Sequence, residues 1–313
     1  DVYKRQDTHT GAGAFEESNY WSKVGLLDGD PENRGSIPLT DENVETMNEY
    51  MQAFNQPVST IELDQGTYAN TGFTQWGASG LAVAWAEENT RDSIFKAFKR
   101  KETFATSGPR MAVRFFGGYN LSSIDLNSES LVSEAYKKGV TMGADLMNDD
   151  NQTPEFIVWA QKDKNSAPLQ RVQIVKGWMD SVSGRPYEKV YDVACSDGLE
   201  VDPLTNRCPD NGARVNISDC SIPQNIGSSE LKTVWQDPEF NSKDKSFYYV
   251  RVLENPTCRW STWDAINRGF EAREDLHETI QERAWSSPIW YVPQKTGVKV
   301  IPLGGNIQLR SAD

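Results

Sequence analysis

Asp7-Thr8-His9 combines two residue types that bind metal ions, at a spacing that lets both reach one ion. A carboxylate and an imidazole in such a D-x-H triplet, at the end of a strand, can act together as ligands. A catalytic metal usually has three protein ligands and one open position, so Asp7 and His9 would form only part of a site. An ordinary capped turn is the alternative interpretation of the triplet.

Other side chains that could do chemistry are scattered along the chain. Glu16-Glu17 and Glu87-Glu88 are carboxylate pairs that could support metal ligands or face a substrate. Solvated acids in a loop and at a helix start are the simpler interpretation of both pairs. Arg91, Arg110 and Arg114 could bind an anionic substrate, although single arginines are weak signals.

The chain has two histidines, and the second, His277, lies in a charged stretch that indicates a solvated surface position. No G-x-S-x-G segment supplies a nucleophilic serine. No G-x-x-x-x-G-K-[ST] or G-x-G-x-x-G segment supplies a phosphate-binding loop. The sequence therefore lacks the usual signals of a serine hydrolase and of a nucleotide-binding protein.

The elements that must position these residues change in character along the chain. Up to about residue 108 the pattern is α/β, with helices predicted over 42–54 and 92–100. In the second helix, Ile94, Phe95 and Phe98 are expected to face inward. From residue 110 the apolar period becomes two, which predicts a sandwich-like β domain. Its strands are expected at 111–116, 155–161, 170–178, 187–194 and 246–253.

The end of the β-rich part is predicted to hold two helices, over 262–268 and around 279–284, and a closing strand at 288–292. Residues 197–236 show little periodicity and are expected to form an ordered insertion tied down by crosslinks. In the strand at 170–178, Arg171, Gln173 and Val175 face opposite to Val172, Ile174 and Lys176, so the alternation of apolar and polar residues is imperfect.

Four cysteines, Cys195, Cys208, Cys220 and Cys258, lie in the C-terminal half of the chain among Gly, Pro, Asp and Asn. Their even number indicates two disulfides and an oxidising compartment. A zinc site is the less favoured alternative, because the close C-x2-C spacing is missing, and unpaired thiols are another. A Cys195–Cys208 bridge would close a short loop in which a crosslink replaces a missing core.

Composition limits the classes of partner. The length of 313 residues suits two domains, and the formal charge of -13 argues against nonspecific binding to nucleic acid or to anionic membranes. No apolar run is long enough for a membrane span. The first six residues resemble the translation of a transposon end used in sequencing libraries, so residues 1–6 are interpreted as a scar.

Several long stretches resemble the bacterial family called domain of unknown function 3604. They are residues 7–11, 80–91, 104–110, 193–199, 254–262 and 280–290. The resemblance implies an N-terminally truncated member of a family of secreted or periplasmic proteins. Its longer members carry a metal-dependent hydrolase domain similar to the polymerase-and-histidinol-phosphatase superfamily, a distorted β/α barrel. Asp7 and His9 match the late D-x-H ligand motif, whereas the early and middle ligands have no counterpart here.

The expected fold is therefore α+β: the C-terminal part of a distorted β/α-barrel-like hydrolase domain at 7–108, a disulfide-stabilised β-sandwich-like domain at 109–293, and a tail at 294–313. In the intact parent, divalent ions (Mn, Fe or Zn) would polarise a phosphoryl or carbonyl oxygen and lower the pKa of a bound water. Glu87, Glu88, Arg91 and Arg110 are candidates for supporting that site or facing the substrate.

Two functions compete. The first is hydrolysis of a phosphoester or another ester or amide by the intact parent, with the truncated chain itself inactive and its small-molecule substrate unknown. The second is a non-catalytic envelope module that binds a glycan or a protein partner. The aromatic contact candidates of that module are Trp178, Trp235, Trp260 and Trp263, for which core packing is the simpler interpretation.

Overall fold

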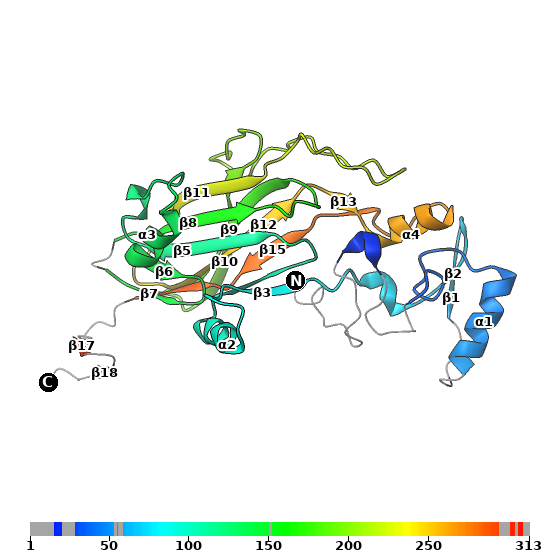
Figure 1. Ribbon diagram of the computed structural model, residues 1–313, viewed down its shortest axis with the longest axis horizontal. Coiled ribbons are helices and arrows are strands. Elements are labelled where there is room, and N and C mark those ends of the chain that lie inside the picture. Colours follow the sequence, from blue (N-terminus) through cyan, green and yellow to red (C-terminus); the bar gives the residue numbers. More distant parts are fainter. Residues whose placement is uncertain are drawn as a thin grey trace.

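The computed structural model describes residues 16–20, 29–52, 55, 59–149, 152–293, 301–303 and 306–308. Two β-sheets face each other across an apolar core, and a smaller lobe stands beside them (Figure 1). The fold is mixed α+β with mostly sheet, and none of the sheets in these ranges closes into a barrel. The two sheets form the sandwich that the period-two pattern predicts.

The larger sheet has eight strands in the order β10-β9-β12-β15-β4-β3, with β16 beside β12 and β7 beside β16. Only the β7–β16 pair among these is parallel. The bounds are β3 Leu81–Ala84, β4 Thr103–Thr106, β7 Asp145–Met147, β9 Leu169–Met179, β10 Pro186–Cys195, β12 Lys245–Glu254, β15 Arg283–Ser286 and β16 Ile289–Val292.

The smaller sheet has four antiparallel strands in the order β11-β8-β5-β6. Their bounds are β5 Ala112–Gly118, β6 Gly139–Thr141, β8 Glu155–Gln161 and β11 Glu230–Gln236. Alternate residues of both sheets meet in one core, with Phe115 and Phe156 from this sheet packing towards Ile174, Tyr248 and Val250 of the larger one. The helices on this side are η4 (Leu121–Ser123) and α3 (Leu131–Lys138).

The segment assigned from the sequence to a hydrolase-like domain, 7–108, supplies two strands of the larger sheet. β4 pairs with β15, and β3 pairs with β4. The boundary expected between 108 and 109 therefore passes through the sandwich. The turn at Ser107-Gly108-Pro109 was visible in the sequence, but a local turn does not reveal which sheet the preceding strand joins.

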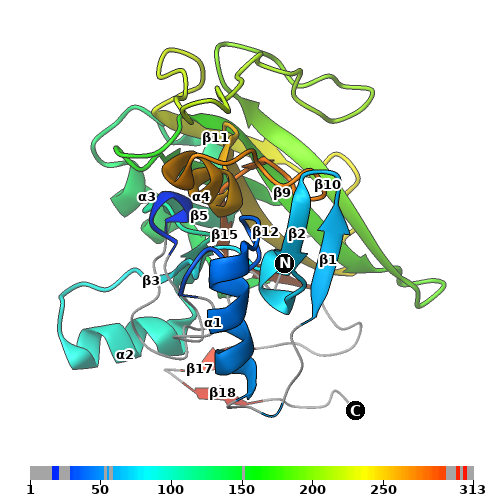
Figure 2. The same cartoon turned by 90° about the vertical axis from the view of Figure 1, so that its right-hand side faces the viewer.

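The lobe is built from two distant parts of the chain (Figure 2). Its elements are η2 (Glu17–Asn19), α1 (Asp41–Gln52), β1 (Thr60–Leu63), β2 (Gly66–Ala69), η3 (Gly72–Gln75) and α4 (Trp260–Arg268). The two parts are joined by a buried ion pair between Arg34 and Asp264, at 2.6 Å, and by the Ser36 hydroxyl, which donates to Asp264 at 2.5 Å. Tyr20 stacks on Trp260 with ring centroids 4.7 Å apart.

Two expectations about helices are wrong. The segment around 279–284 is not helical: Thr279–Ile280 (β14) pairs with Thr257–Cys258 (β13), and Arg283–Ser286 is β15. Its helix-forming residues are overridden by pairing with strands distant in sequence. In α2 (Arg91–Arg100), Phe95 and Phe98 are 58% and 56% exposed, because the helix packs through its buried Ala97 instead.

Several elements were not predicted from the sequence, and α3 and β11 are the clearest examples. Helix α3 is short, and strand β11 lies inside the segment taken as an irregular insertion. The remaining insertion, 197–229, has only Ala213 and Cys220 buried among its apolar residues. A last short hairpin joins β17 (Ile301–Leu303) and β18 (Asn306–Gln308).

Candidate functional site

A pocket of about 310 Å³ lies where the lobe meets the sandwich. We call it the junction pocket. Carboxylates dominate its polar lining: Glu16 and Glu17 come from the lobe, and Asp163 and Glu282 come from loops of the sandwich. Trp263 of α4 and the disulfide partners Cys220 and Cys258 complete its wall. The pocket is therefore acidic, and most of its carboxylates already accept hydrogen bonds from the protein.

Glu17 is buried and bridges two segments through backbone groups. Its Oε1 accepts the N–H of Ala78 at 2.7 Å, and its Oε2 accepts the N–H of Trp260 at 2.8 Å. The Trp260 N–H belongs to the first turn of α4, where helix N–H groups lack intrahelical acceptors and the dipole favours an anion. Glu17 thus fixes η2 against α4, and within the described ranges the carboxylate of its neighbour Glu16 accepts an exposed bond from the Asn19 side-chain amide.

The sandwich carboxylates also have partners. Asp163 Oδ2 accepts the backbone N–H of Arg110 at 2.7 Å, and its Oδ1 accepts that of Asn165 at 2.9 Å. The Ser107 hydroxyl donates to Glu282 across the turn that follows β4. Asp163 and Glu282 therefore hold the loops that surround the pocket, in addition to giving it negative charge.

Glu254, at the end of β12, lies behind this wall. Its Oε2 accepts the Ser166 hydroxyl at 2.6 Å, and its Oε1 has no hydrogen-bond partner among the described residues. Burial raises the pKa of the Glu254 carboxyl well above its usual range, and the charges of Glu282 and Asp163 raise it further. Ser166 lines the pocket, so its hydroxyl links the Glu254 carboxyl to the pocket.

The junction pocket does not fit a metal ion by itself. Within the described ranges, no three His, Cys, Asp or Glu side chains converge in a way that could hold one. The carboxylates there are turned to backbone N–H groups and hydroxyls rather than to a shared point. Asp7 and His9, the predicted ligands, lie outside the described residues.

The other predicted site residues are not brought together. Glu87, Glu88 and Arg91 are exposed near the start of α2. They follow the end of β3 at which Ala84 pairs with Thr103 of β4. Arg110 is also exposed, but it follows the opposite end of the β3–β4 ladder. These four side chains therefore form no common site in this structure.

Arg114 and His277 have no catalytic surroundings. The Arg114 guanidinium lies 3.5 Å from the ring centroid of Trp85 and 3.7 Å from a Glu102 carboxylate oxygen. This is a packed cation–π and ion-pair contact on the smaller sheet. His277 is exposed in the loop before β14.

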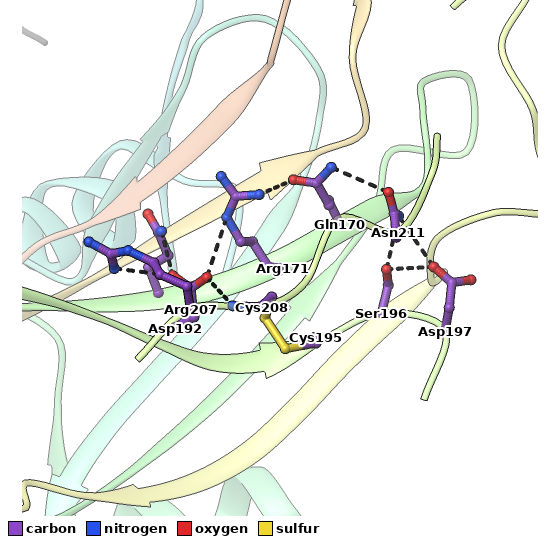
Figure 3. The surroundings of a disulfide bond; sticks show 10 residues. Gln170, Arg171, Asp192, Cys195, Ser196, Asp197, Arg207, Cys208 and Asn211 are labelled. Carbon is purple, nitrogen blue, oxygen red and sulfur yellow. Dashed lines mark hydrogen bonds and ion pairs between the residues drawn. A yellow bond between two sulfur atoms is a disulfide. The ribbon is translucent and has the colours of Figure 1, made fainter. Parts of the chain in front are cut away.

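The four cysteines form two disulfides, Cys195–Cys208 and Cys220–Cys258, each with Cα atoms 5.6 Å apart. The prediction of two bridges is confirmed, and so is the pairing considered for the first. Figure 3 shows Cys195–Cys208 beneath Arg171, Asp192 and Arg207. This bridge joins the end of β10 to the insertion, which has little apolar core of its own. Two disulfides are compatible with an oxidising, extracytoplasmic compartment.

The tryptophans proposed as contact residues divide into two groups. Trp260 is fully buried and Trp235 packs against the sandwich core, so both are structural. Trp263 lines the junction pocket. Trp178 stacks on the neighbouring-strand Tyr187, with ring centroids 5.5 Å apart. Only the last two tryptophans can meet a ligand.

Sequence reasoning missed Asp163, Glu254 and Glu282, because isolated acids in loops and at a strand end carry no spacing signal. It also missed a cluster of arginines on the outer face of the larger sheet. The alternation of Arg171 and Gln173 with Val172 and Ile174 in β9 was the available signal, because polar residues opposite the apolar ones mark the sheet face that points away from the core.

A family model described as "Protein of unknown function (DUF3604)" matches residues 3–293 of the chain. The match begins inside the six residues interpreted as a scar. No curated protein and no solved structure matches the chain significantly. None of the described helices combines the length and apolar character needed to cross a bilayer.

Proposed function

Since the chain belongs to the DUF3604 family, whose description gives no activity, we propose that it is part of a metal-dependent hydrolase, with Asp7 and His9 as metal ligands, as the resemblance given under Sequence analysis implies. The proposed substrate carries a phosphoester or another ester or amide. We also propose a distorted β/α-barrel hydrolase domain of the polymerase-and-histidinol-phosphatase kind in the intact parent, and a periplasmic or secreted location.

The junction pocket is the observation that carries this proposal. Six residues separate His9 from Glu16, which lines the pocket, and Glu17 is anchored to both Ala78 and Trp260. An extended chain spans about 3.5 Å per residue, so the D-x-H triplet is within reach of an acidic pocket. A concave site with several converging polar groups is the usual setting for substrate binding.

The proposal needs metal ligands other than those described. A catalytic ion usually has three protein ligands, and the described carboxylates are engaged in fixing loops. Asp7 and His9 would therefore act together with ligands outside the described ranges. The junction pocket would bind the substrate beside the metal rather than the metal itself, with Trp263 as an apolar wall.

Metal analysis tests this proposal. The protein, expressed with its natural N-terminal sequence and purified without chelators, is expected to retain Mn, Fe or Zn, and Asp7→Ala and His9→Ala are each expected to lose most of it. His277→Ala is the matched control, because it removes the chain's other histidine from an exposed loop. Metal content that is unchanged in Asp7→Ala and His9→Ala, or lost equally in His277→Ala, would contradict the ligand assignment.

A substrate screen narrows the reaction. Phosphodiester, phosphomonoester and carboxyl ester substrates are assayed with the metal-loaded protein and with Asp7→Ala. Hydrolysis of one class that disappears in Asp7→Ala identifies the bond that is cleaved. Turnover that survives in Asp7→Ala would show that the activity does not depend on this motif.

The second candidate function, a binding module for a glycan or a protein, is favoured by one observation. Trp178 and Tyr187 stack on adjacent strands, and Tyr187 is 47% exposed. Exposed aromatic pairs are enriched at recognition surfaces. If this function is correct, Trp178→Ala removes binding to envelope glycans without changing metal content. Trp235→Ala, in the core, would instead destabilise the fold.

A further inference from the structure

A second pocket, of about 530 Å³, lies on the outer face of the larger sheet next to the Cys195–Cys208 disulfide. We call it the arginine pocket. Arg171, Asp192, Arg207 and Cys208 are among its lining residues. Arg251 and Arg283 stand near it on the same sheet face. It is separate from the junction pocket and does not depend on the proposed hydrolase function.

The strand register brings these arginines together. Arg171 of β9 and Arg283 of β15 are both paired with Leu253, one on each side of β12. Arg251 lies two residues earlier on β12, and its neighbour on β9 is Gln173. Side chains alternate between the two faces of a sheet. Because Val172, Val250 and Val252 point into the core, these three arginines share the outer face.

A single buried carboxylate offsets the positive charge of this cluster. Asp192 lies 3.7 Å from Arg171 Nε and 3.5 Å from an Arg207 terminal nitrogen. Its oxygens also accept the Gln173 amide at 2.6 Å and the Cys208 backbone N–H at 2.7 Å (Figure 3). Asp210 lines the pocket too, but it forms its own ion pair with Arg214.

Two guanidinium donors remain unused inside the cluster. The Nε atoms of Arg171 and Arg283 are buried and have no hydrogen-bond partner among the described residues. Arg251 donates its Nε proton to Gln173, a neutral amide, at 2.6 Å. The pKa of the Arg171 guanidinium is lowered by burial, against the influence of Asp192, and lowered further by Arg251, Arg207 and Arg283. Four guanidinium groups thus repel one another around one carboxylate.

We propose that the arginine pocket binds a tetrahedral oxyanion, that is, a phosphoryl or sulfuryl group carried by a ligand. A planar guanidinium donates two parallel N–H bonds to such a group, and several of them can share its oxygens. The anion would supply an acceptor to the unused Nε of Arg171, which lines the pocket, and would relieve the repulsion between the guanidinium groups. The size of the pocket leaves room for the rest of a small ligand beside the anion.

Thermal unfolding of the full chain tests the proposal with inorganic phosphate and sulfate as probes. At equal ionic strength, both are expected to raise Tm above its value in chloride, because an anion that binds only the folded state stabilises it. Titration calorimetry with inorganic phosphate then measures Kd. Arg171→Gln and Arg207→Gln are each expected to weaken binding about tenfold, through loss of a charge-assisted hydrogen bond.

Arg185→Gln is the matched control, because Arg185 is exposed just before β10 and does not line the pocket. It should leave Kd unchanged. Arg207 is half exposed, so Arg207→Gln remains informative if Arg171→Gln does not fold. The proposal is overturned if phosphate and sulfate act no differently from chloride, or if Arg185→Gln weakens binding as much as Arg207→Gln. Stabilisation by acetate or citrate alone would show a carboxylate site instead.

Discussion

The β13–β14 ladder contributes residues to two pockets of different character, one lined by carboxylates and one by arginines beside Asp192, and each pocket is bordered by one disulfide. In the junction pocket, carboxylates accept backbone N–H groups at helix starts and turns, where such donors have no other partner. In the arginine pocket, guanidinium groups lie over a sheet whose backbone carbonyls mostly accept hydrogen bonds from neighbouring strands. The fold itself therefore satisfies the acids of the junction pocket, whereas the Nε atoms of Arg171 and Arg283 have no acceptor among the described residues.

Removing the one carboxylate among the arginines should give the largest effect. Asp192→Ala is expected to lower the free energy of unfolding by about 3–5 kcal/mol, as for other buried ion pairs that lose one partner. Urea unfolding measures the change. Phosphate should recover part of the loss if an anion can take the place of Asp192. Asp210→Ala, at the exposed pair with Arg214, should change stability little. An equal loss of stability in Asp210→Ala and Asp192→Ala would contradict the special role of the buried carboxylate.

The two disulfides should differ in the stability that they add. Their sequence separations are 13 for Cys195–Cys208 and 38 for Cys220–Cys258. Loop-closure entropy predicts losses of about 3 and about 4 kcal/mol when each pair is replaced by alanine. Non-reducing urea unfolding of the two double variants measures both. Only the first variant should also weaken phosphate binding, because Cys208 N–H positions Asp192.

The neighbouring acids of the junction pocket provide a matched pair. Glu17→Ala should cost about 2–3 kcal/mol, because two buried N–H groups lose a charged acceptor. Glu16→Ala should cost much less, because its bond to Asn19 is exposed. Tm measurements on both variants test this difference. Similar losses in both would mean that Glu17 does not fix η2 to α4.

The smallest effect concerns pH. The folded-state pKa of Glu254 is raised, mainly by burial, so its stabilising contribution is complete below its unfolded pKa of about 4.3. It is lost as pH rises through the folded-state pKa. Glu254→Gln should therefore match wild type in Tm near about pH 4 and exceed it increasingly towards about pH 8. A Tm difference that does not depend on pH would contradict the raised pKa.

Secondary structure was predictable from the sequence wherever the apolar residues repeat with one dominant period. β8 begins and ends where the sequence predicts, and the strands expected at 170–178, 187–194 and 246–253 are present with small shifts at their ends. Helix α2 begins after Thr90, whose hydroxyl accepts the Ser93 N–H, as its sequence favours. The strands at 279–286 were missed because their partners lie far away in the sequence.

The sequence by itself determined the period-two strands and the presence of two disulfides, because side-chain alternation and an even cysteine count are local or compositional signals. The tertiary structure alone decided that β3 and β4 join the sandwich and that Asp163, Glu254 and Glu282 gather near one pocket. It also decided that Arg171, Arg251 and Arg283 share one sheet face. Those contacts depend on strand register and loop closure between distant segments, which no short stretch of sequence encodes.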